Sequence, residues 1–207
     1  MCGIVAGVAG RDVVPVFLQG LKRLVGSEMC IRDRRNGEID RARSVARVKD
    51  LAEQVQAEGM QGTVGIAHTR WATHGGPVVA NAHPHIAGNR IALVHNGIIE
   101  NFAQLRAELE ATGVTMQSQT DTEVLAHLVN FYLEDDLLEA LKKALSRVTG
   151  AYAVAVFDKR HPERIVGARQ GSPMVVGLGE GENFIASDAM ALVGVTDKIV
   201  YLDDGDI

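Results

Sequence analysis

The chain begins with Met1-Cys2-Gly3-Ile4-Val5 and continues as an apolar run to Ala9, a pattern that predicts a buried strand directly behind a cysteine. Removal of Met1 would leave Cys2 with both a thiol and a free α-amino group. An α-amine has an ordinary pKa of about 7.7–8.0, so it can act as a base near neutral pH. A nucleophile that uses the chain terminus as its general base is one route to covalent catalysis. Two interpretations therefore stand: a catalytic terminus, and a small buried residue at the start of a strand.

The composition favours a globular domain in a reducing compartment. The 207 residues suit one domain, and the contents of hydrophobic (46%) and charged (23%) residues are ordinary for a soluble protein. No apolar run approaches the ~20 residues that span a bilayer, and the N-terminus lacks the layout of a signal peptide. The net charge of −5 gives no reason to expect nucleic acid or anionic membranes as partners. Two cysteines, Cys2 and Cys30, make no disulfide framework, so we expect a cytoplasmic protein.

The expected elements group helices between two runs of strands, which favours an α+β layered domain over a strictly alternating α/β one. Several patterns of apolar residues carry this expectation. The expected strands are Gly3–Ala9, Gly62–Thr69, Arg90–His95 and several short ones after Ala151; the expected helices are Asp12–Leu24, Ser44–Ala57, Asn101–Thr112, Val124–Leu133, Asp136–Val148 and a short one near Ser187–Val193.

Three local signals refine this outline. Asn96-Gly97 predicts a tight turn at the end of its strand. Thr120-Asp121-Thr122-Glu123 has the spacing of a capping box at a helix start. Residues 25–40 show neither helical nor strand periodicity, and the turn at Asp204-Gly205-Asp206-Ile207 leads us to expect a fragment of a longer chain.

Polar clusters occur where loops are expected, in positions that often carry function. The clusters are His68–Gly75, His95–Asn101 and Gln119–Glu123. Each also has an alternative explanation when it is taken alone: a solvated loop, a hairpin turn and a capped helix, in that order.

Together, and in this order behind Cys2, the clusters resemble the glutaminase domain of the glutamine–fructose-6-phosphate aminotransferases, or glucosamine-6-phosphate synthases. These are N-terminal-nucleophile (class II) glutamine amidotransferases. Besides the start of the chain, the resemblance rests on Arg70-Trp71-Ala72-Thr73-His74-Gly75, Asn81-Ala82-His83-Pro84-His85, Val94–Asn101, Thr120–Glu123, Gly171-Ser172-Pro173 and Asn183–Asp188.

The resemblance implies a four-layer α/β/β/α sandwich of antiparallel sheets, with residues 1–207 forming one amidotransferase domain of type 2. It implies hydrolysis of L-glutamine to glutamate and ammonia, without a metal or organic cofactor. In the full-length enzyme the ammonia would be used to make glucosamine 6-phosphate from fructose 6-phosphate. We expect the sugar-phosphate isomerase domain for that step to lie outside this chain, and any homo-oligomer to form through it.

The resemblance also implies roles for individual residues. Cys2 would attack the amide carbon, and the Asn96 side chain and Gly97 N–H would stabilise the oxyanion. Arg70 would hold the substrate α-carboxylate and Asp121 its α-ammonium group. The remaining substrate-binding residues would be Thr73 and His74 in the glutamine pocket and Trp71 as a gate over the ammonia exit.

The other histidines are expected to be structural. His83-Pro84-His85 lacks companions at metal-ligand spacing, so a loop role is expected. His68, His95 and His127 lie on apolar elements and are expected to be satisfied residues of the core or its rim.

One stretch departs from the family. Where relatives continue with Tyr-Arg-Gly-Tyr-Asp-Ser-Ala-Gly and a core strand, this chain has the unmatched residues Val25–Arg34. This mismatch indicates a sequence error or a damaged copy, and an inert domain is one alternative to an active enzyme. Another alternative is an N-terminal-Cys hydrolase that cleaves a different amide, although Arg70 and Asp121 suit the two charges of a free amino acid.

Overall fold

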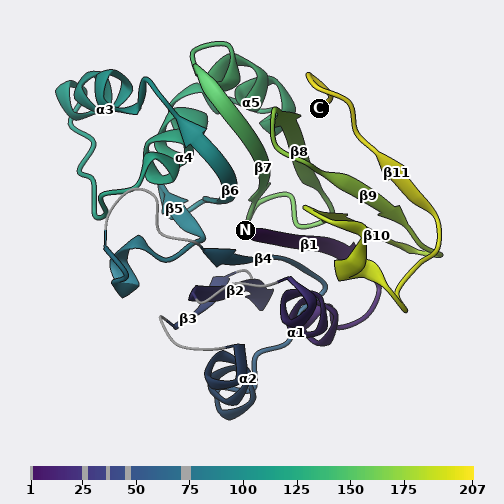
Figure 1. The fold of residues 1–207 in the computed structure, drawn as a ribbon. Helices are drawn as coiled ribbons and strands as arrows, with labels where there is room; N and C mark the ends of the chain where they lie inside the picture. Colours follow the sequence, from purple (N-terminus) through teal and green to yellow (C-terminus); the bar gives the residue numbers. More distant parts are fainter. Residues whose placement is uncertain (1, 25–27, 36–37, 45–47, 71–75) are drawn as a thin grey trace.

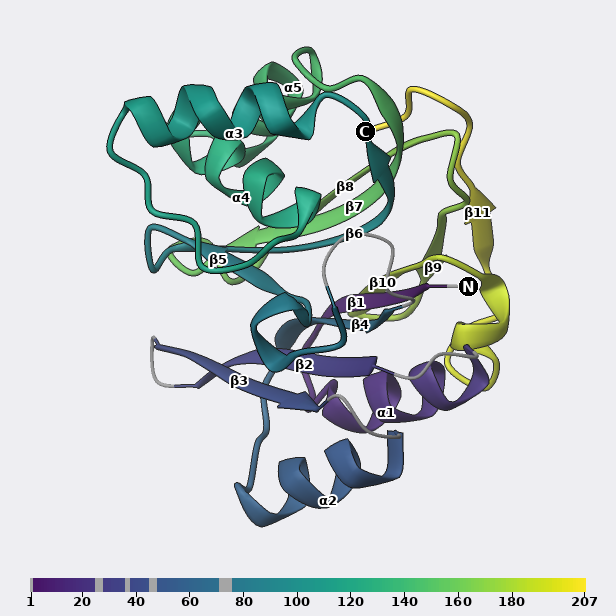
Figure 2. The ribbon, with the colours of Figure 1, turned by 60° about the vertical axis from the view of Figure 1, so that its left-hand side comes forward.

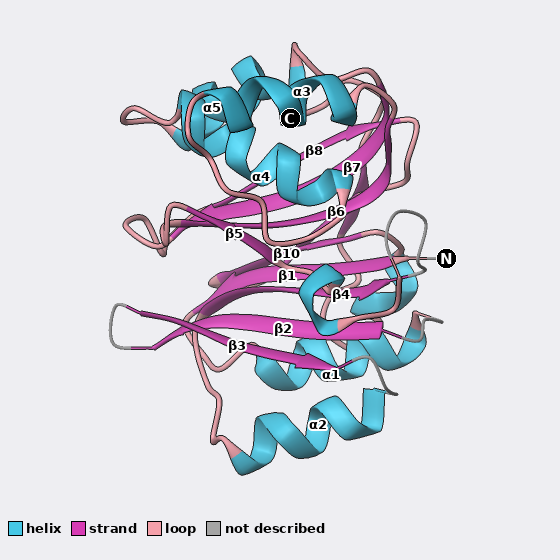
Figure 3. Ribbon diagram, turned by 90° about the vertical axis from the view of Figure 1, so that its left-hand side faces the viewer, coloured by secondary structure: helices cyan, strands magenta, loops and turns pink. Residues whose placement is uncertain are grey.

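The structure, a computed structural model, describes residues 2–24, 28–35, 38–44, 48–70 and 76–207. Two antiparallel sheets lie face to face, and helices cover the outer face of each sheet (Figure 1). Figure 3 shows the resulting order of helices, sheet, sheet and helices. The predicted α+β class and the four-layer α/β/β/α sandwich are therefore confirmed.

The larger sheet of the described residues has seven strands in the order β11-β9-β10-β1-β4-β2-β3. Its strands are β1 (Gly3–Ala9), β2 (Glu28–Arg35), β3 (Glu38–Ser44), β4 (Val64–Arg70), β9 (Val175–Leu178), β10 (Glu182–Ala186) and β11 (Ile199–Tyr201). In the part of the chain that the structure describes, the smaller sheet has four strands in the order β5-β6-β7-β8. These are β5 (His85–Ala87), β6 (Ile91–Ile99), β7 (Gly150–Asp158) and β8 (Ile165–Gln170).

The helices pack in two groups. Those on the larger sheet are α1 (Val14–Arg23) and α2 (Val48–Ala57); those on the smaller sheet are α3 (Phe102–Ala111), α4 (Asp121–Tyr132) and α5 (Leu137–Leu145). Short 3-10 helices lie at Val79–Asn81 and Ala189–Leu192. None of the helices in the described part of the chain has the length and apolar character needed to span a bilayer.

Strand β1 lies in the middle of the molecule, between β10 and β4 (Figure 2). Alternate residues of a strand point to opposite faces of the sheet. Ile4 and Ala6 accordingly join the apolar layer between the two sheets, whereas Val5 joins the layer beneath the helices. Burial on both faces explains why β1 reads as a continuous apolar run.

Two stretches before β4 differ from the sequence prediction. The stretch 25–40, which showed no periodicity, contains β2 and the start of β3, and β2 pairs antiparallel with both β3 and β4. These backbone pairings define a strand whose sequence has no regular apolar pattern, which is why the sequence does not predict it. The helix predicted from Ser44 begins at Val48, because Ser44 still pairs with Met29 as the last residue of β3.

Asn96-Gly97 is not the tight turn that the sequence predicts. Both residues lie inside β6, where Asn96 pairs with Ala153 and Gly97 pairs with Tyr152 of β7. Gly97 has a φ of 133°, and a Cβ atom there would lie 2.0 Å from the Ala151 carbonyl oxygen. A glycine inside a strand often marks a close approach of another backbone, and here the pairing with β7 continues past Gly97 to Ile99.

Gly150, which pairs with Ile99, has the same constraint. Its φ is 126°, and a Cβ atom would lie 2.2 Å from the Ile98 carbonyl oxygen. Gly150→Ala should therefore lower the free energy of unfolding by at least about 2 kcal/mol, measured by urea denaturation. Gly10→Ala is the matched control, because a Cβ at Gly10 would have no neighbour within 4 Å. Equal stability of the two variants would contradict the backbone described for Gly150.

Candidate active site

Cys2 lies where the start of β1 meets the end of β4. It directly precedes β1, whose residue Gly3 pairs with Thr69 of β4. Continuing this antiparallel register by one residue brings Cys2 level with Arg70, the last residue of β4. Cys2 is half-buried and not in a disulfide, and Arg70 is buried. Two predicted site residues, far apart in the sequence, thus meet at one end of neighbouring strands.

Residues of β10 and the turn after it hold the start of β1. The backbone N–H of Ile4 donates to Ser187 Oγ at 3.0 Å, and the backbone N–H of Ser187 donates to the Ile4 carbonyl at 3.0 Å. With pairing to β4 on the other edge, β1 is fixed from its first residues. The position of Cys2 is therefore set by backbone hydrogen bonds on both sides.

Asn96 brings the smaller sheet to Cys2. Its Nδ2 donates a hydrogen bond to the Cys2 carbonyl oxygen at 3.0 Å, which joins β6 to the start of the chain. Gly97 follows it on β6. The structure therefore brings Cys2, Arg70, Asn96 and Gly97 to one region, where the start of β1 and the end of β4 lie near β6.

Asp121 lies beside the last part of β6. Its carboxylate accepts hydrogen bonds from the backbone N–H of Ile99 at 2.9 Å and from that of Thr122 at 3.0 Å. A carboxylate has about four lone-pair sites, so these two bonds leave acceptor capacity for a cation. Asp121 is buried in the first turn of α4. Its hydrogen-bond partner Ile99 follows Gly97 by two residues on β6.

The predicted capping box is present in part. Thr120 Oγ1 accepts a hydrogen bond from the Glu123 N–H at 3.2 Å, as expected for a helix N-cap. The Glu123 carboxylate instead accepts from the backbone N–H groups of Gln117 and Ser118. This arrangement ties the preceding loop to α4 and fixes the first turn that carries Asp121.

Trp71, Thr73 and His74, the other predicted site residues, lie outside the described residues. They follow Arg70 directly in the sequence. Their proposed roles remain predictions.

Among the described residues, four buried histidines surround this region: His68, His83, His85 and His95. The rings of His68 and His83 stack with centroids 4.1 Å apart. His83 and His95 both contact Thr122 Oγ1, and His85 contacts Thr120 Oγ1. The sequence predicts structural histidines but not their grouping. The available signal was the two-residue spacing of His68 and Arg70, which puts both side chains on one face of β4.

Burial lowers the pKa of His68 and of His85 to about 3, and that of His83 well below its usual range, because the charged imidazolium would lose its hydration. These rings are therefore neutral near pH 7. Among the described residues, no three His, Cys, Asp or Glu side chains are grouped so as to hold a metal ion.

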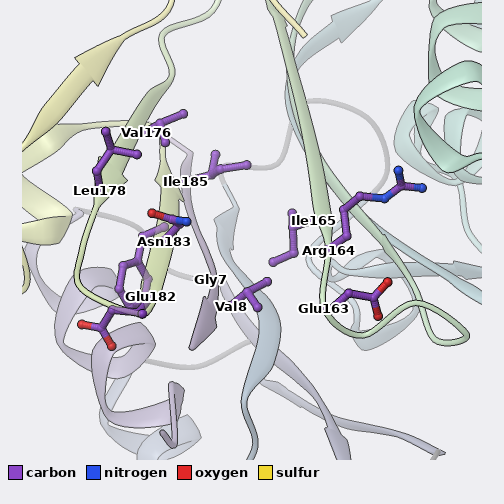
Figure 4. Close-up of a pocket in the computed structure, with 12 residues that line it drawn as sticks. Gly7, Val8, Glu163, Arg164, Ile165, Val176, Leu178, Glu182, Asn183 and Ile185 are labelled. Atoms are coloured by element: carbon purple, nitrogen blue, oxygen red, sulfur yellow. The ribbon is translucent and has the colours of Figure 1, made fainter. Parts of the chain in front are cut away.

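A cavity of about 780 Å³ opens beside Cys2 and is also lined by Arg23, Met174, Asp188 and Tyr201. A second cavity of about 440 Å³ lies toward the other end of β1, at Gly7 and Val8. Figure 4 shows side chains of β9 and β10 on one side of this second cavity and those around the start of β8 on the other. None of the predicted site residues that the structure describes lines this second cavity, so we place the site at the Cys2 end.

The fold and the cysteine at the start of β1 define an N-terminal-nucleophile type of amidotransferase structure. A glutamine phosphoribosylpyrophosphate amidotransferase from B. subtilis superimposes with a TM-score of 0.81 and 25% identity, over 97% of this chain and 44% of that one. The sequence profile of the glutamine amidotransferase domain matches residues 68–194, more than half of the chain. The chain therefore belongs to the glutamine amidotransferase domain family.

The relatives include glutamine–fructose-6-phosphate aminotransferases (isomerizing). That of Bordetella pertussis is 56% identical over all of this chain, and that of Pseudomonas putida is 50% identical over all of it. The chain spans 35% of the length of each of these relatives.

Because the buried histidines are neutral in the folded state, we expect the free energy of unfolding to fall in mild acid. Their pKa values are lowered in the folded state, so below the ordinary pKa of about 6.5 the unfolded chain binds protons that the folded chain does not. The free energy of unfolding should decrease from pH 6.5 toward pH 3, by on the order of 1 kcal/mol per pH unit for each such histidine. Urea denaturation at pH 7.5 and 5.5 measures this difference. His85→Phe should make the dependence shallower, and a free energy unchanged between the two pH values would contradict the prediction.

Proposed function

We propose that this domain hydrolyses the side-chain amide of L-glutamine to glutamate and ammonia. The observation that carries the proposal is the hydrogen bond from Asn96 Nδ2 to the Cys2 carbonyl. This bond places the amide donor of Asn96, on the smaller sheet, beside Cys2. Once Met1 is removed, Cys2 carries both a thiol and the α-amine of the chain. Membership of the glutamine amidotransferase domain family supports the choice of glutamine.

In the proposed reaction, the α-amine of Cys2 takes the thiol proton and Sγ attacks the amide carbon of glutamine. The oxyanion that forms is stabilised by two hydrogen-bond donors, Asn96 Nδ2–H and the Gly97 N–H. These donors act in a partly water-excluded site. The α-ammonium returns the proton to the leaving nitrogen, and the C–N bond breaks to release ammonia. Water then attacks the thioester carbon while the Cys2 α-amine takes one of its protons. The bond to Sγ breaks, the α-ammonium returns that proton to Sγ, and glutamate leaves.

Two buried charged residues would recognise the free amino acid. Arg70 offers a planar guanidinium suited to two parallel hydrogen bonds with the α-carboxylate. Asp121, with the acceptor capacity that remains, would hold the α-ammonium group. Thr73 and His74 would complete the pocket, and Trp71 would close the ammonia exit.

We further propose that residues 1–207 form one amidotransferase domain that supplies ammonia to a second domain. The relatives named as glutamine–fructose-6-phosphate aminotransferases support this, because the matched region is 35% of their length. That second domain would make glucosamine 6-phosphate from fructose 6-phosphate and would form any homo-oligomer. The glutaminase step requires no cofactor in this scheme, and a reducing cytoplasm would keep the Cys2 thiol available.

Labelling of the cysteine tests the proposal. A diazoketone analogue of glutamine should add one equivalent to the chain, detected by intact mass, and should abolish ammonia release. Cys2→Ala should lose both the label and the activity, while Cys30→Ala, the matched control, keeps both. Intact mass also reports whether Met1 has been removed, since a retained Met1 blocks the amine.

Three results would contradict the proposal or favour its rivals. Activity of Cys2→Ala equal to that of the parent would exclude Cys2 as the nucleophile. A parent chain with processed Met1 that melts cooperatively but releases no ammonia would be an inert domain. A chain that cleaves other amides but is not labelled by the glutamine analogue would be a different hydrolase.

Recognition of the α-carboxylate gives a separate prediction. Arg70→Lys keeps the charge but loses the paired geometry, which costs a charge-assisted hydrogen bond of ~1.5–3 kcal/mol. The KM for glutamine should rise by about 10- to 100-fold, with a smaller change in kcat. Arg11→Lys is the control, because Arg11 forms an exposed ion pair with Glu182. An unchanged KM in Arg70→Lys would remove Arg70 from the glutamine site.

A further inference from the structure

His68 faces the same interior layer as the proposed active site. Side chains of β4 alternate between the two faces of the sheet. Ile66 belongs to the apolar layer between the sheets and Ala67 to the layer beneath the helices. His68 and Arg70 share the face of Ile66, and His68 is only 1% exposed. Its ring therefore points from β4 toward β6 of the other sheet.

The hydrogen bonds of the ring determine its tautomer. His68 Nε2 lies 3.1 Å from the His95 carbonyl oxygen and 2.8 Å from Asn96 Oδ1. A carbonyl oxygen can only accept, so Nε2 carries the hydrogen and donates it. His68 Nδ1 has no hydrogen-bond partner among the described residues, as expected for the unprotonated nitrogen of a buried neutral ring.

The tautomer in turn determines the orientation of the Asn96 carboxamide. An amide NH₂ group facing Nε2–H would oppose donor to donor, so the amide oxygen must face His68. The nitrogen then faces Cys2, where Nδ2 donates to the carbonyl oxygen at 3.0 Å. Nδ2 carries two hydrogens, and the second remains for an additional acceptor.

Other contacts hold the His68 ring in place. His83 stacks on it with an interplanar angle of 30°, and His83 Nε2 lies 2.8 Å from Thr122 Oγ1. Because burial lowers the pKa of His68 to about 3, the ring keeps the neutral tautomer over the working range of an enzyme near pH 7. The ring thus offers one fixed donor with little freedom to turn.

We propose that His68 is a positioning residue that holds the Asn96 carboxamide with its N–H groups toward Cys2 and the oxyanion. The proposal rests on the proposed glutaminase reaction, in which Asn96 is an oxyanion donor. Without the Nε2–H donor, one of the two hydrogen bonds that favour this orientation is lost and the bond from Nδ2 to the Cys2 carbonyl oxygen remains, so the carboxamide is held less firmly and the flipped orientation becomes more populated. The flipped orientation would present Oδ1 to the oxyanion and oppose the transition state electrostatically.

Two variants of His68 separate positioning from packing. His68→Phe keeps an aromatic ring against His83 but has no donor. His68→Gln places an amide NH₂ near the position of Nε2. His68→Phe should lower kcat by roughly 10- to 100-fold with KM for glutamine within about threefold of the parent. His68→Gln should recover most of the lost kcat. His127→Phe, on α4 near Glu123, is the control and should keep the parent values.

A double-mutant cycle with Asn96→Ala gives the decisive comparison. Asn96→Ala alone should lower kcat by on the order of 10²- to 10³-fold. Because His68 acts through Asn96, adding His68→Phe to Asn96→Ala should cause no further loss of kcat. An equal loss from His68→Phe in both backgrounds would overturn the proposal, as would a raised KM with unchanged kcat or a His68→Gln variant as slow as His68→Phe.

A measurement on the unmodified domain does not depend on how the variants fold. Nitrogen-15 NMR of labelled histidines should show His68 as the Nε2–H tautomer from pH 5 to 8. A Nδ1–H tautomer, or titration of this ring near its ordinary pKa of about 6.5, would overturn the proposal, since Nε2 could not then act as a fixed neutral donor. Failure of the glutaminase proposal is recognised separately, by a parent chain that neither releases ammonia nor takes the diazoketone label.

Discussion

Strand β1 is constrained on all sides, and the site depends on that constraint. It pairs with β10 on one edge and β4 on the other, and both of its faces are buried. Burial of a side chain such as Ile4 stabilises the fold by about 2 kcal/mol, so moving this strand would disrupt two core layers together. A residue placed directly before β1 therefore has a nearly fixed backbone. Cys2 occupies that position and gains a defined location that chain termini usually lack.

The smaller sheet supplies the Asn96 amide that reaches Cys2, next to β1 of the larger sheet. β6 crosses near β1 and β4, so Asn96 reaches Cys2 and His68 reaches Asn96. Both hydrogen bonds cross the layer between the sheets, which also contains an apolar cluster that includes Ile4, Ile66 and Val94. Buried polar groups are costly unless they are paired, so such bonds favour one relative placement of the two sheets. The packing of the sheets and the geometry of the proposed oxyanion site therefore depend on the same two hydrogen bonds.

Helix α4 adds a third fixed point. Its N-terminal turn is held by Thr120 and Glu123, and Asp121 bonds to the end of β6 through the Ile99 N–H. The proposed carboxylate and ammonium contacts of glutamine would then come from different elements, Arg70 from β4 and Asp121 from α4. Separate rigid supports of this kind fix the distance between two charged groups better than one loop could.

Much of this protein was predictable from sequence patterns. The apolar run behind Cys2, the capping signal at Thr120 and the resemblance of three clusters to one family indicated the fold class and the candidate residues. Local patterns work for such features because they depend on neighbours along the chain. They failed at β2, whose position depends on pairing with β3 and β4. They also failed at Asn96-Gly97, where the glycine is needed because the Ala151 backbone lies close and not because the chain turns.

The sequence by itself therefore determined the residues available for chemistry, the order of most elements and the family. Only the tertiary structure decided that Asn96 lies inside a strand and that its amide faces Cys2. It also decided that a histidine two residues before Arg70 orients that amide. These features depend on hydrogen bonds between residues 27, 28 and 94 positions apart in the chain. Contacts at such separations exist only after the two sheets have packed.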